Sequence, residues 1–473
     1  MTTGMNLWDT DVWSFVLTLS LLFAAMILAN ILRNNCRFIR KALIPSSVLG
    51  GFLLLLANWG WKSISGSPLY PTGMLETLTY HGLGLGFAAL ALRRHEKMTD
   101  ERSRTGALDT GITVVNGYLL QGVLGLLVTI GLSYALNSFF GAGAILPMGY
   151  GQGPGQAYTW GHTYEVSWGF TNGTSFGLTV AAMGFVSASV GGVIHLNLLK
   201  RKGIFKGELG SDAKDELTVS TFTDENEIPI TESIDKFTVQ LALAFLAYTL
   251  AFLFMKGVNT LLDPHGTGAT GLAGTIQGMV WGFQFLFSSV FGILIKTLLA
   301  VLRKKDIIRR EYTNNFMQNR IAGFMFDLMV VASIAAIDLS AFKDAEFVLP
   351  LSVICVLGAV GTYFYLRIVC RHVFPWYEHE AFLSLYGTQT GTASTGVILL
   401  RELDPHFDTQ ASDNLVYHMP WAILFGAPFF LMVGLVPQSR GKSWLVCGIC
   451  AGLFILFNIL LFRKNLFKKK KKK

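Results

Sequence analysis

Apolar residues fill eleven long segments of this chain, and polar residues collect between them. Each segment is close to the roughly 20 residues that an α-helix needs to cross a bilayer. The pattern therefore predicts an all-α polytopic membrane protein with eleven spans. The segments are 12–32, 43–61, 73–92, 107–136, 173–199, 237–255, 273–301, 321–341, 346–368, 415–436 and 443–462.

The composition of the 473 residues agrees with that pattern. Hydrophobic residues make up 52% of the chain and charged residues only 14%, whereas a soluble domain carries about 25% charged residues. Too few polar residues are present to cover the surface of a soluble protein of this length. The composition thus excludes a soluble globular protein, a disordered chain and a secreted disulfide scaffold.

The positions of the basic residues predict the orientation of the chain. Arg33, Arg37, Arg40 and Lys41 directly follow the first apolar segment. Loops rich in Lys and Arg stay in the cytoplasm, so we expect the N-terminus outside and the C-terminus inside. The chain is therefore expected to cross the membrane many times. Alternation of the spans puts the remaining basic clusters inside: 93–104, 200–236, 303–320, 367–371 and 463–473.

One long hydrophilic segment, 200–236, divides the apolar segments into five before it and six after it. Because five is odd, the second set starts from the opposite side of the membrane. Two similar halves of opposite orientation are typical of secondary transporters. We therefore expect four parts: a first repeat (1–199), a cytoplasmic connecting loop (200–236), a second repeat (237–436), and an extra C-terminal span with a polybasic tail (437–473).

Each predicted repeat has a segment rich in Gly, Thr and Gln between its fourth and fifth spans, at about 144–165 and 382–402. Both segments are too polar to face lipid, and irregular backbone at membrane depth needs cover from protein or a water-filled cavity. Glycine lets backbone carbonyls turn towards an ion, and Thr and Gln add neutral donors and acceptors. We predict two re-entrant segments that meet near the bilayer midplane. The alternative is a pair of ordinary loops.

The candidate binding residues come from these two segments and from one span. Gly151, Gly391 and Asp327 are the candidates for a cation site. The candidates for contact with substrate are Gln152, Gly153, Gly155, Gln156, Thr159, Thr388, Gln389, Thr390, Thr392, Ser394, Thr395 and Arg401.

Ionisable residues inside spans are costly to bury and often mark function. Asp327 and Asp338 are eleven residues apart, so one continuous helix would put both on the same face. Arg401 is a candidate partner for a substrate carboxylate, with a cytoplasmic anchor as the alternative. In that second case the backbone N–H groups near Gln156 and Thr395 would hold the anion. His195 is interpreted as a packing histidine with its hydrogen bonds satisfied.

Five stretches of the chain carry recognisable motifs: Gly151-Gln-Gly-Pro-Gly-Gln-Ala, Trp168-Gly-Phe-Thr-Asn172, Ile44-Pro-Ser-Ser-Val-Leu-Gly-Gly51, Thr390-Gly-Thr-Ala-Ser-Thr-Gly-Val397 and Gly426-Ala-Pro-Phe-Phe430. They resemble motifs of the bacterial sodium/glutamate symporters, and the resemblance covers about residues 12–436. Gln152 stands where that family's motif has histidine, and Gln156 where a small residue is usual. The eleventh span is also extra. The resemblance implies two inverted five-helix repeats, a homodimer in the bacterial cytoplasmic (inner) membrane and a sliding, elevator-type transport cycle.

These observations predict sodium-coupled symport of an anionic amino acid, with glutamate as the substrate that the resemblance implies. Na⁺ is the expected coupling ion, membrane lipid surrounds the protein, and no other cofactor and no nucleic acid is expected. The sequence has no His-Glu-x-x-His metalloprotease motif and no Gly-x-x-x-x-Gly-Lys-Ser/Thr phosphate loop, and an enzyme is not expected. A proton- or sodium-coupled carrier of another carboxylate, and a channel, stay open as alternatives.

Overall fold

The computed structural model describes residues 6–94, 101–205, 209, 235–264, 266, 271–405 and 407–463. Helices make up 83% of it, and the described residues contain no strand. The all-α prediction is confirmed. Most of the predicted connecting loop and the polybasic tail lie outside the described residues.

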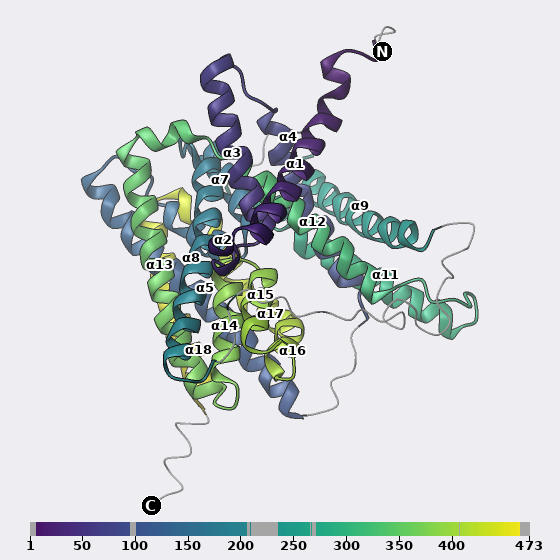
Figure 1. Ribbon diagram of the computed structural model, residues 1–473, viewed down its shortest axis with the longest axis vertical. Coiled ribbons are helices and arrows are strands. Elements are labelled where there is room, and N and C mark those ends of the chain that lie inside the picture. Colours follow the sequence, from purple (N-terminus) through teal and green to yellow (C-terminus); the bar gives the residue numbers. More distant parts are fainter. Residues whose placement is uncertain are drawn as a thin grey trace, which may run out of the picture. The chain divides into compact units, whose positions relative to one another are not determined.

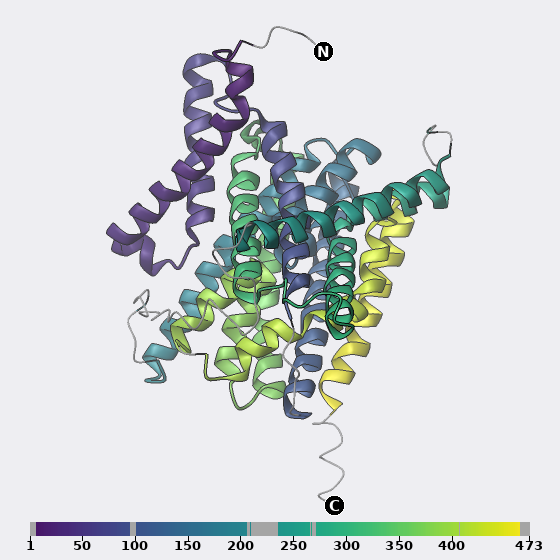
Figure 2. The ribbon, with the colours of Figure 1, turned by 90° about the vertical axis from the view of Figure 1, so that its right-hand side faces the viewer.

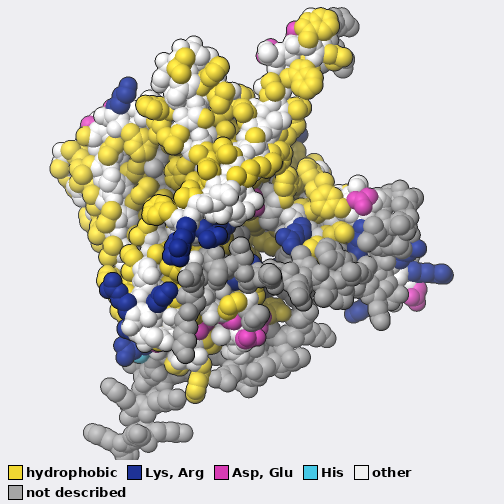
Figure 3. Space-filling view, in the orientation of Figure 1, with side chains coloured by type: hydrophobic (Ala, Val, Ile, Leu, Met, Phe, Trp, Pro, Cys, Tyr) yellow, Lys and Arg dark blue, Asp and Glu magenta, His cyan; other side chains and the backbone are white. Residues whose placement is uncertain are grey.

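Eight of the described helices are long and apolar enough to cross a membrane, which makes the chain a multi-pass membrane protein. Hydrophobic side chains cover much of the surface seen over α1, α3 and α13 in Figure 3. The eight are α1 (Thr10–Asn35), α5 (Glu101–Ala135), α8 (Gly173–Arg201), α9 (Lys236–Leu262), α11 (Gln284–Lys304), α13 (Ala345–Val373), α17 (Met419–Val433, extended to Gln438 as a span) and α18 (Arg440–Leu461).

The other predicted spans are helical too, but one of them is divided. α3 (Ser46–Ser65), α4 (Thr72–Leu92) and α12 (Asn315–Ala335) match three predicted segments. The predicted span 273–301 is wrong as a single helix, because α10 (Gly271–Gly282) stops before Phe283 and α11 begins after it. Short helices complete the chain: α2 (Arg37–Lys41), α6 (Ile145–Tyr150), α7 (Pro154–Trp168), α14 (Glu378–Thr390), α15 (Ala393–Leu403) and α16 (Gln410–Tyr417).

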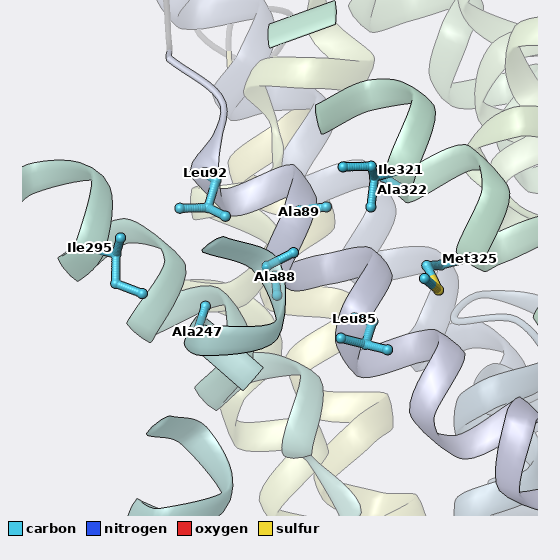
Figure 4. Packing of buried hydrophobic residues seen from close by; sticks show 10 residues of the cluster. Leu85, Ala88, Ala89, Leu92, Ala247, Ile295, Ile321, Ala322 and Met325 are labelled. Atoms are coloured by element: carbon cyan, nitrogen blue, oxygen red, sulfur yellow. The ribbon is translucent and has the colours of Figure 1, made fainter. Parts of the chain in front are cut away.

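The chain forms two compact units, and each unit takes segments from both predicted repeats. Unit 1 consists of Met1–Glu76, Met98–Asp212 and Val330–Lys473, and unit 2 of Thr77–Lys97 and Ala213–Met329. In unit 2, small and branched side chains of α4, α9, α11 and α12 form the core in Figure 4, with Ala88, Ala247 and Ala322 almost completely buried. Alanine at these contacts lets helices approach closely without a strong hydrophobic driving force between them.

Unit 1 is organised around α5 and α8, which can be followed in Figures 1 and 2. α8 packs against α6, α7, α13 and α14, and α5 packs against α13, α17 and α18. A Cβ at Gly177 or Gly184 of α8 would overlap the carbonyl oxygen of Ala157 or of Thr390. Glycine at these two positions therefore allows α8 to lie directly on α7 and on the end of α14.

The C-terminal helix α18 is fastened to α5 near both ends. Arg463 Nη2 lies 2.8 Å from Asp109 Oδ1, and that carboxylate is buried. Towards the other end, Arg440 donates to the carbonyl oxygen of Ser133 at 3.0 Å and lies over the ring of Tyr134. The extra span α18 therefore packs along α5, which also reaches the candidate site.

Candidate functional site

The first Gly-rich segment is a broken helix rather than a loop. α6 ends at Tyr150, α7 begins at Pro154, and residues 151–153 join them. Gly153 has φ 84° and ψ −175°, a region that is essentially open only to glycine. Pro154 then starts α7 with a φ angle already suited to a helix. The segment is therefore more helical than the sequence indicated, with an irregular part of only three residues.

The second segment has the same plan. α14 ends at Thr390, α15 begins at Ala393, and Gly391 and Thr392 form the break. Thr392 caps α15, since its hydroxyl accepts from the backbone N–H of Thr395 at 3.5 Å. The two helices fold back on each other as a hairpin, and a Cβ built on Gly387 would lie 2.7 Å from Cα of Gly396.

The two breaks face each other within unit 1. A Cβ built on Gly153 would lie 3.4 Å from Cγ2 of Thr392 and 3.7 Å from the carbonyl oxygen of Gly391. We call residues 151–153 and 391–392 together the break site. It brings together two helix N-termini, of α7 and α15, and two helix C-termini, of α6 and α14. The N-termini favour negative charge and the C-termini favour positive charge.

Helix α5 contacts both breaks. The ring of Tyr118 packs where a Cβ on Gly151 would sit. Nε2 of Gln121 donates to the carbonyl oxygen of Gln389 at 2.9 Å and to Oγ1 of Thr362 on α13 at 3.0 Å. Sequence reasoning missed Tyr118 and Gln121. A glutamine in the middle of an apolar span is the signal that would have drawn attention to Gln121.

Two carboxamide oxygens near the second break, on Gln121 and Gln389, are buried with no partner among the described residues, and that of Gln389 lies against Gly117 of α5. Gln389 donates through Nε2 to the carbonyl oxygen of Val114 at 2.8 Å. Oε1 of Gln389 and Oε1 of Gln121 accept no hydrogen bond from the described residues, and both side chains are fully buried. A buried acceptor left unpaired costs about 1–3 kcal/mol. Such oxygens are suited to a cation or to a protonated amine.

The remaining candidates lie within two turns of the breaks, with hydroxyls bonded inside their own helices. Oε1 of Gln156 accepts from Nε1 of Trp160 at 3.2 Å, and Thr159 donates to the carbonyl oxygen of Gly155 at 2.8 Å. Thr388 and Thr390 donate to carbonyl oxygens one turn earlier. The first turn of α15 holds Ser394, which is exposed, and Thr395, which is buried.

Three charged candidates lie outside the residues of the two breaks. Arg401 is in the last turn of α15, over the ring of Phe407, and nine residues of helix put it roughly 13 Å from Thr392. Asp327 is exposed on α12 in unit 2. The prediction that Asp327 and Asp338 share a helix face is wrong, because α12 ends at Ala335 and Asp338 instead caps a 3₁₀ turn.

Paired broken helices with opposed ends, inside a polytopic helical protein, are the arrangement of secondary transporters. The model of the sodium/glutamate symporter family matches residues 13–263, just over half of the chain, and the protein belongs to that family. The family membership predicted from the motifs is confirmed. No curated protein matches the chain. The family's activity is sodium-coupled glutamate symport, which indicates a transporter rather than an enzyme.

Proposed function

We propose that the protein carries an anionic amino acid together with Na⁺ through the break site, and that glutamate is its first candidate substrate. The observation that carries the proposal is the contact between the two breaks, at Gly153 and Thr392. Residues 150–156 and 388–396 contain no Asp, Glu, Lys, Arg or His. Charge recognition at the site therefore rests on helix ends and on neutral polar groups.

The helix N-termini supply the anion-binding groups. α7 and α15 are 15 and 11 residues long, and each presents first-turn N–H groups and a positive dipole end at the break site. Two such ends suit the two carboxylates of a dicarboxylic amino acid. Gln152, Thr392 and Ser394 are the side chains placed to add hydrogen bonds.

The helix C-termini supply the cation-binding groups. The last carbonyl oxygens of α6 and α14, next to Gly151 and Gly391, have no partner further along their own helices. The carboxamide oxygens of Gln121 and Gln389, which are buried with no partner among the described residues, are the side-chain groups that we add to them. Neither break segment supplies a carboxylate, and Asp327 on α12 of unit 2 stays the acidic candidate for a cation ligand.

This arrangement couples the two solutes. With Na⁺ bound, the carbonyl and carboxamide oxygens are satisfied, and the added positive charge favours the anionic substrate. Moving the empty oxygens through an apolar environment is unfavourable. We therefore propose alternating access by an elevator-type movement in a homodimer of the bacterial inner membrane, built from inverted repeats at 1–199 and 237–436.

The test is uptake of radiolabelled glutamate into proteoliposomes with and without an inward sodium gradient. We expect saturable accumulation that depends on sodium and is competed by other dicarboxylic amino acids. Accumulation driven by a proton gradient alone would identify a proton-coupled carrier, and competition by simple carboxylates only would identify another substrate. Flux without accumulation would identify a channel.

The orientation predicted from the basic clusters can be tested by single cysteines in a Cys36→Ser background, because the other four cysteines are buried. An impermeant thiol reagent added outside is expected to label the positions that the topology places outside and to miss those inside. Labelling at an inside position from outside would contradict the inverted halves. The outside positions are Lys62, Lys343 and Arg440, and the inside positions are Lys202 and Lys305.

Arg401 provides a test of how charge is recognised. Its distance from the break site leads us to expect that Arg401→Gln leaves the KM for glutamate within about twofold, since less than about 0.5 kcal/mol of binding is lost. Arg401→Lys should behave in the same way. A large rise in KM in the Gln variant, partly recovered by Lys, would place a substrate carboxylate on the guanidinium, because Lys lacks the planar fork.

A further inference from the structure

A second polar cluster lies at the start of α14, against the ends of α8 and α13. Oε1 of Glu378 is 3.3 Å from Nη2 of Arg367 and 3.2 Å from Nε2 of His379. The imidazole of His195 lies with its centroid 5.4 Å from that of His379. Nδ1 of His195 is 3.3 Å from the hydroxyl of Tyr363.

Three nitrogen atoms of this cluster are buried with no hydrogen-bond partner among the described residues. They are Nη1 of Arg367, Nε2 of His195 and Nδ1 of His379. His195 is only 3% exposed, so bulk water does not reach its ring. The interpretation of His195 as a satisfied packing histidine is therefore wrong for one of its two nitrogens. Each of three helices contributes one unsatisfied nitrogen.

The Glu378 carboxylate fixes the tautomer of neutral His379, whereas the tautomer of His195 follows from which atom donates in its hydrogen bond to Tyr363. A carboxylate only accepts, so Nε2 of His379 donates to Glu378, and Nδ1 of the neutral ring holds a lone pair. With the Tyr363 hydroxyl donating to Nδ1 of His195, Nε2 of His195 carries the hydrogen. The guanidinium of Arg367 has N–H donors and no acceptor. The cluster thus offers two unmet donors, and a third when His379 takes up a proton.

The local charge is positive. Arg367 and Lys202 both act on the two imidazoles, and Glu378 is the single acid that acts on His379. Glu380, the next acid on α14, instead accepts from backbone N–H groups of its own helix and faces Asp404. Two cations against one carboxylate leave one positive charge beside three unmet nitrogens.

We propose that this cluster binds one small monovalent anion of the chloride class. Nη1 of Arg367 and Nε2 of His195 donate to the anion, and His379 takes up a proton on Nδ1 as the anion binds. The centroids of the two imidazole rings are 5.4 Å apart. His379 lies twelve residues before Gly391 on α14, roughly 18 Å along the helix. The anion site is therefore separate from the break site and goes beyond the proposed function.

The proton gives the site a defined pH dependence. Without an anion, burial lowers the pKa of His379 most, Arg367 and Lys202 lower it further by charge repulsion, and Glu378 raises it. The bound anion cancels this repulsion, and linkage requires the proton to strengthen anion binding by the same factor. Chloride affinity is thus expected to rise as the pH falls, by up to about tenfold per pH unit for one linked proton.

The experiment is a thermal unfolding titration of the full-length protein in detergent, with chloride replacing gluconate at constant sodium and ionic strength. We expect a saturable rise in the unfolding midpoint, at lower chloride near about pH 6 than near about pH 8. Arg367→Gln should raise the half-saturating chloride concentration by at least about tenfold. The matched control is Arg371→Gln, one turn further along α13 and exposed, which should leave it unchanged.

Three outcomes would overturn the proposal. They are no saturable chloride effect, an equal effect in the Arg367→Gln and Arg371→Gln variants, and an Arg367-dependent effect of phosphate or glutamate but not of chloride. If Arg367→Gln does not fold, the same chloride titration is made with His195→Asn, which should also raise the half-saturating chloride concentration. Stabilisation by glutamate that is unchanged in these variants shows an intact break site. A failed anion site is thereby distinguished from a failed transport proposal.

Discussion

Gly153→Ala is expected to reduce sodium-driven glutamate uptake to background while the protein stays folded. The backbone at Gly153, with φ 84° and ψ −175°, is strained for any other residue by on the order of 1–3 kcal/mol. The added Cβ would also lie 3.4 Å from Thr392 and 3.7 Å from the carbonyl oxygen of Gly391. It would fill the space between the breaks. Uptake per molecule in proteoliposomes, with folding checked by size-exclusion chromatography, is the measurement.

Gly169→Ala is the matched control for this prediction. Gly169 also has a positive φ, 71°, but a Cβ there would meet nothing within 4 Å. Strain alone should then lower stability by about 1–2 kcal/mol and leave uptake per molecule unchanged. Wild-type uptake by the Gly153→Ala variant would show that substrate does not pass between the breaks.

Gln389→Met is expected to raise the sodium concentration for half-maximal uptake by about ten- to a hundredfold. Methionine keeps the length of the side chain but removes the carboxamide, and a lost hydrogen bond or contact to a charged group costs about 1.5–3 kcal/mol. Oε1 of Gln389 is one of the two buried carboxamide oxygens near the second break that have no partner among the described residues. Sodium dependence of initial uptake rates at fixed glutamate is the measurement.

Gln318→Met separates this effect from a general loss of stability. Gln318 is fully buried in unit 2 and also has an unpaired Oε1. The same substitution there should lower the unfolding temperature and leave the sodium dependence as in the wild type. Equal shifts in the two variants, or a shift in neither, would remove Gln389 from the proposed sodium site.

The sequence by itself determined the features that depend on local composition. Long apolar runs specified the helices, because about 20 residues without charge have a stable place only in a bilayer or a core. The glycines around Gln152 and the Gly391–Thr392 pair indicated both breaks. Glycine permits backbone conformations that interrupt a helix, so a break of this kind can be recognised from the local sequence. The same motifs also identified the family. The apolar segment 273–301 has no comparable polar, glycine-rich stretch, so the sequence did not predict that it divides at Phe283.

Only the tertiary structure decided which distant residues share a site. Gly153 and Thr392 are more than two hundred residues apart in the sequence, and they meet because glycines on α8 let α7 and α14 lie against it. The same packing brought Gln121 and Tyr118 to the breaks and placed Arg401 two to three turns away. It also put Asp327 and Asp338 on different elements. Local patterns set where a helix forms or breaks, whereas contacts between helices depend on the shape of both surfaces at once.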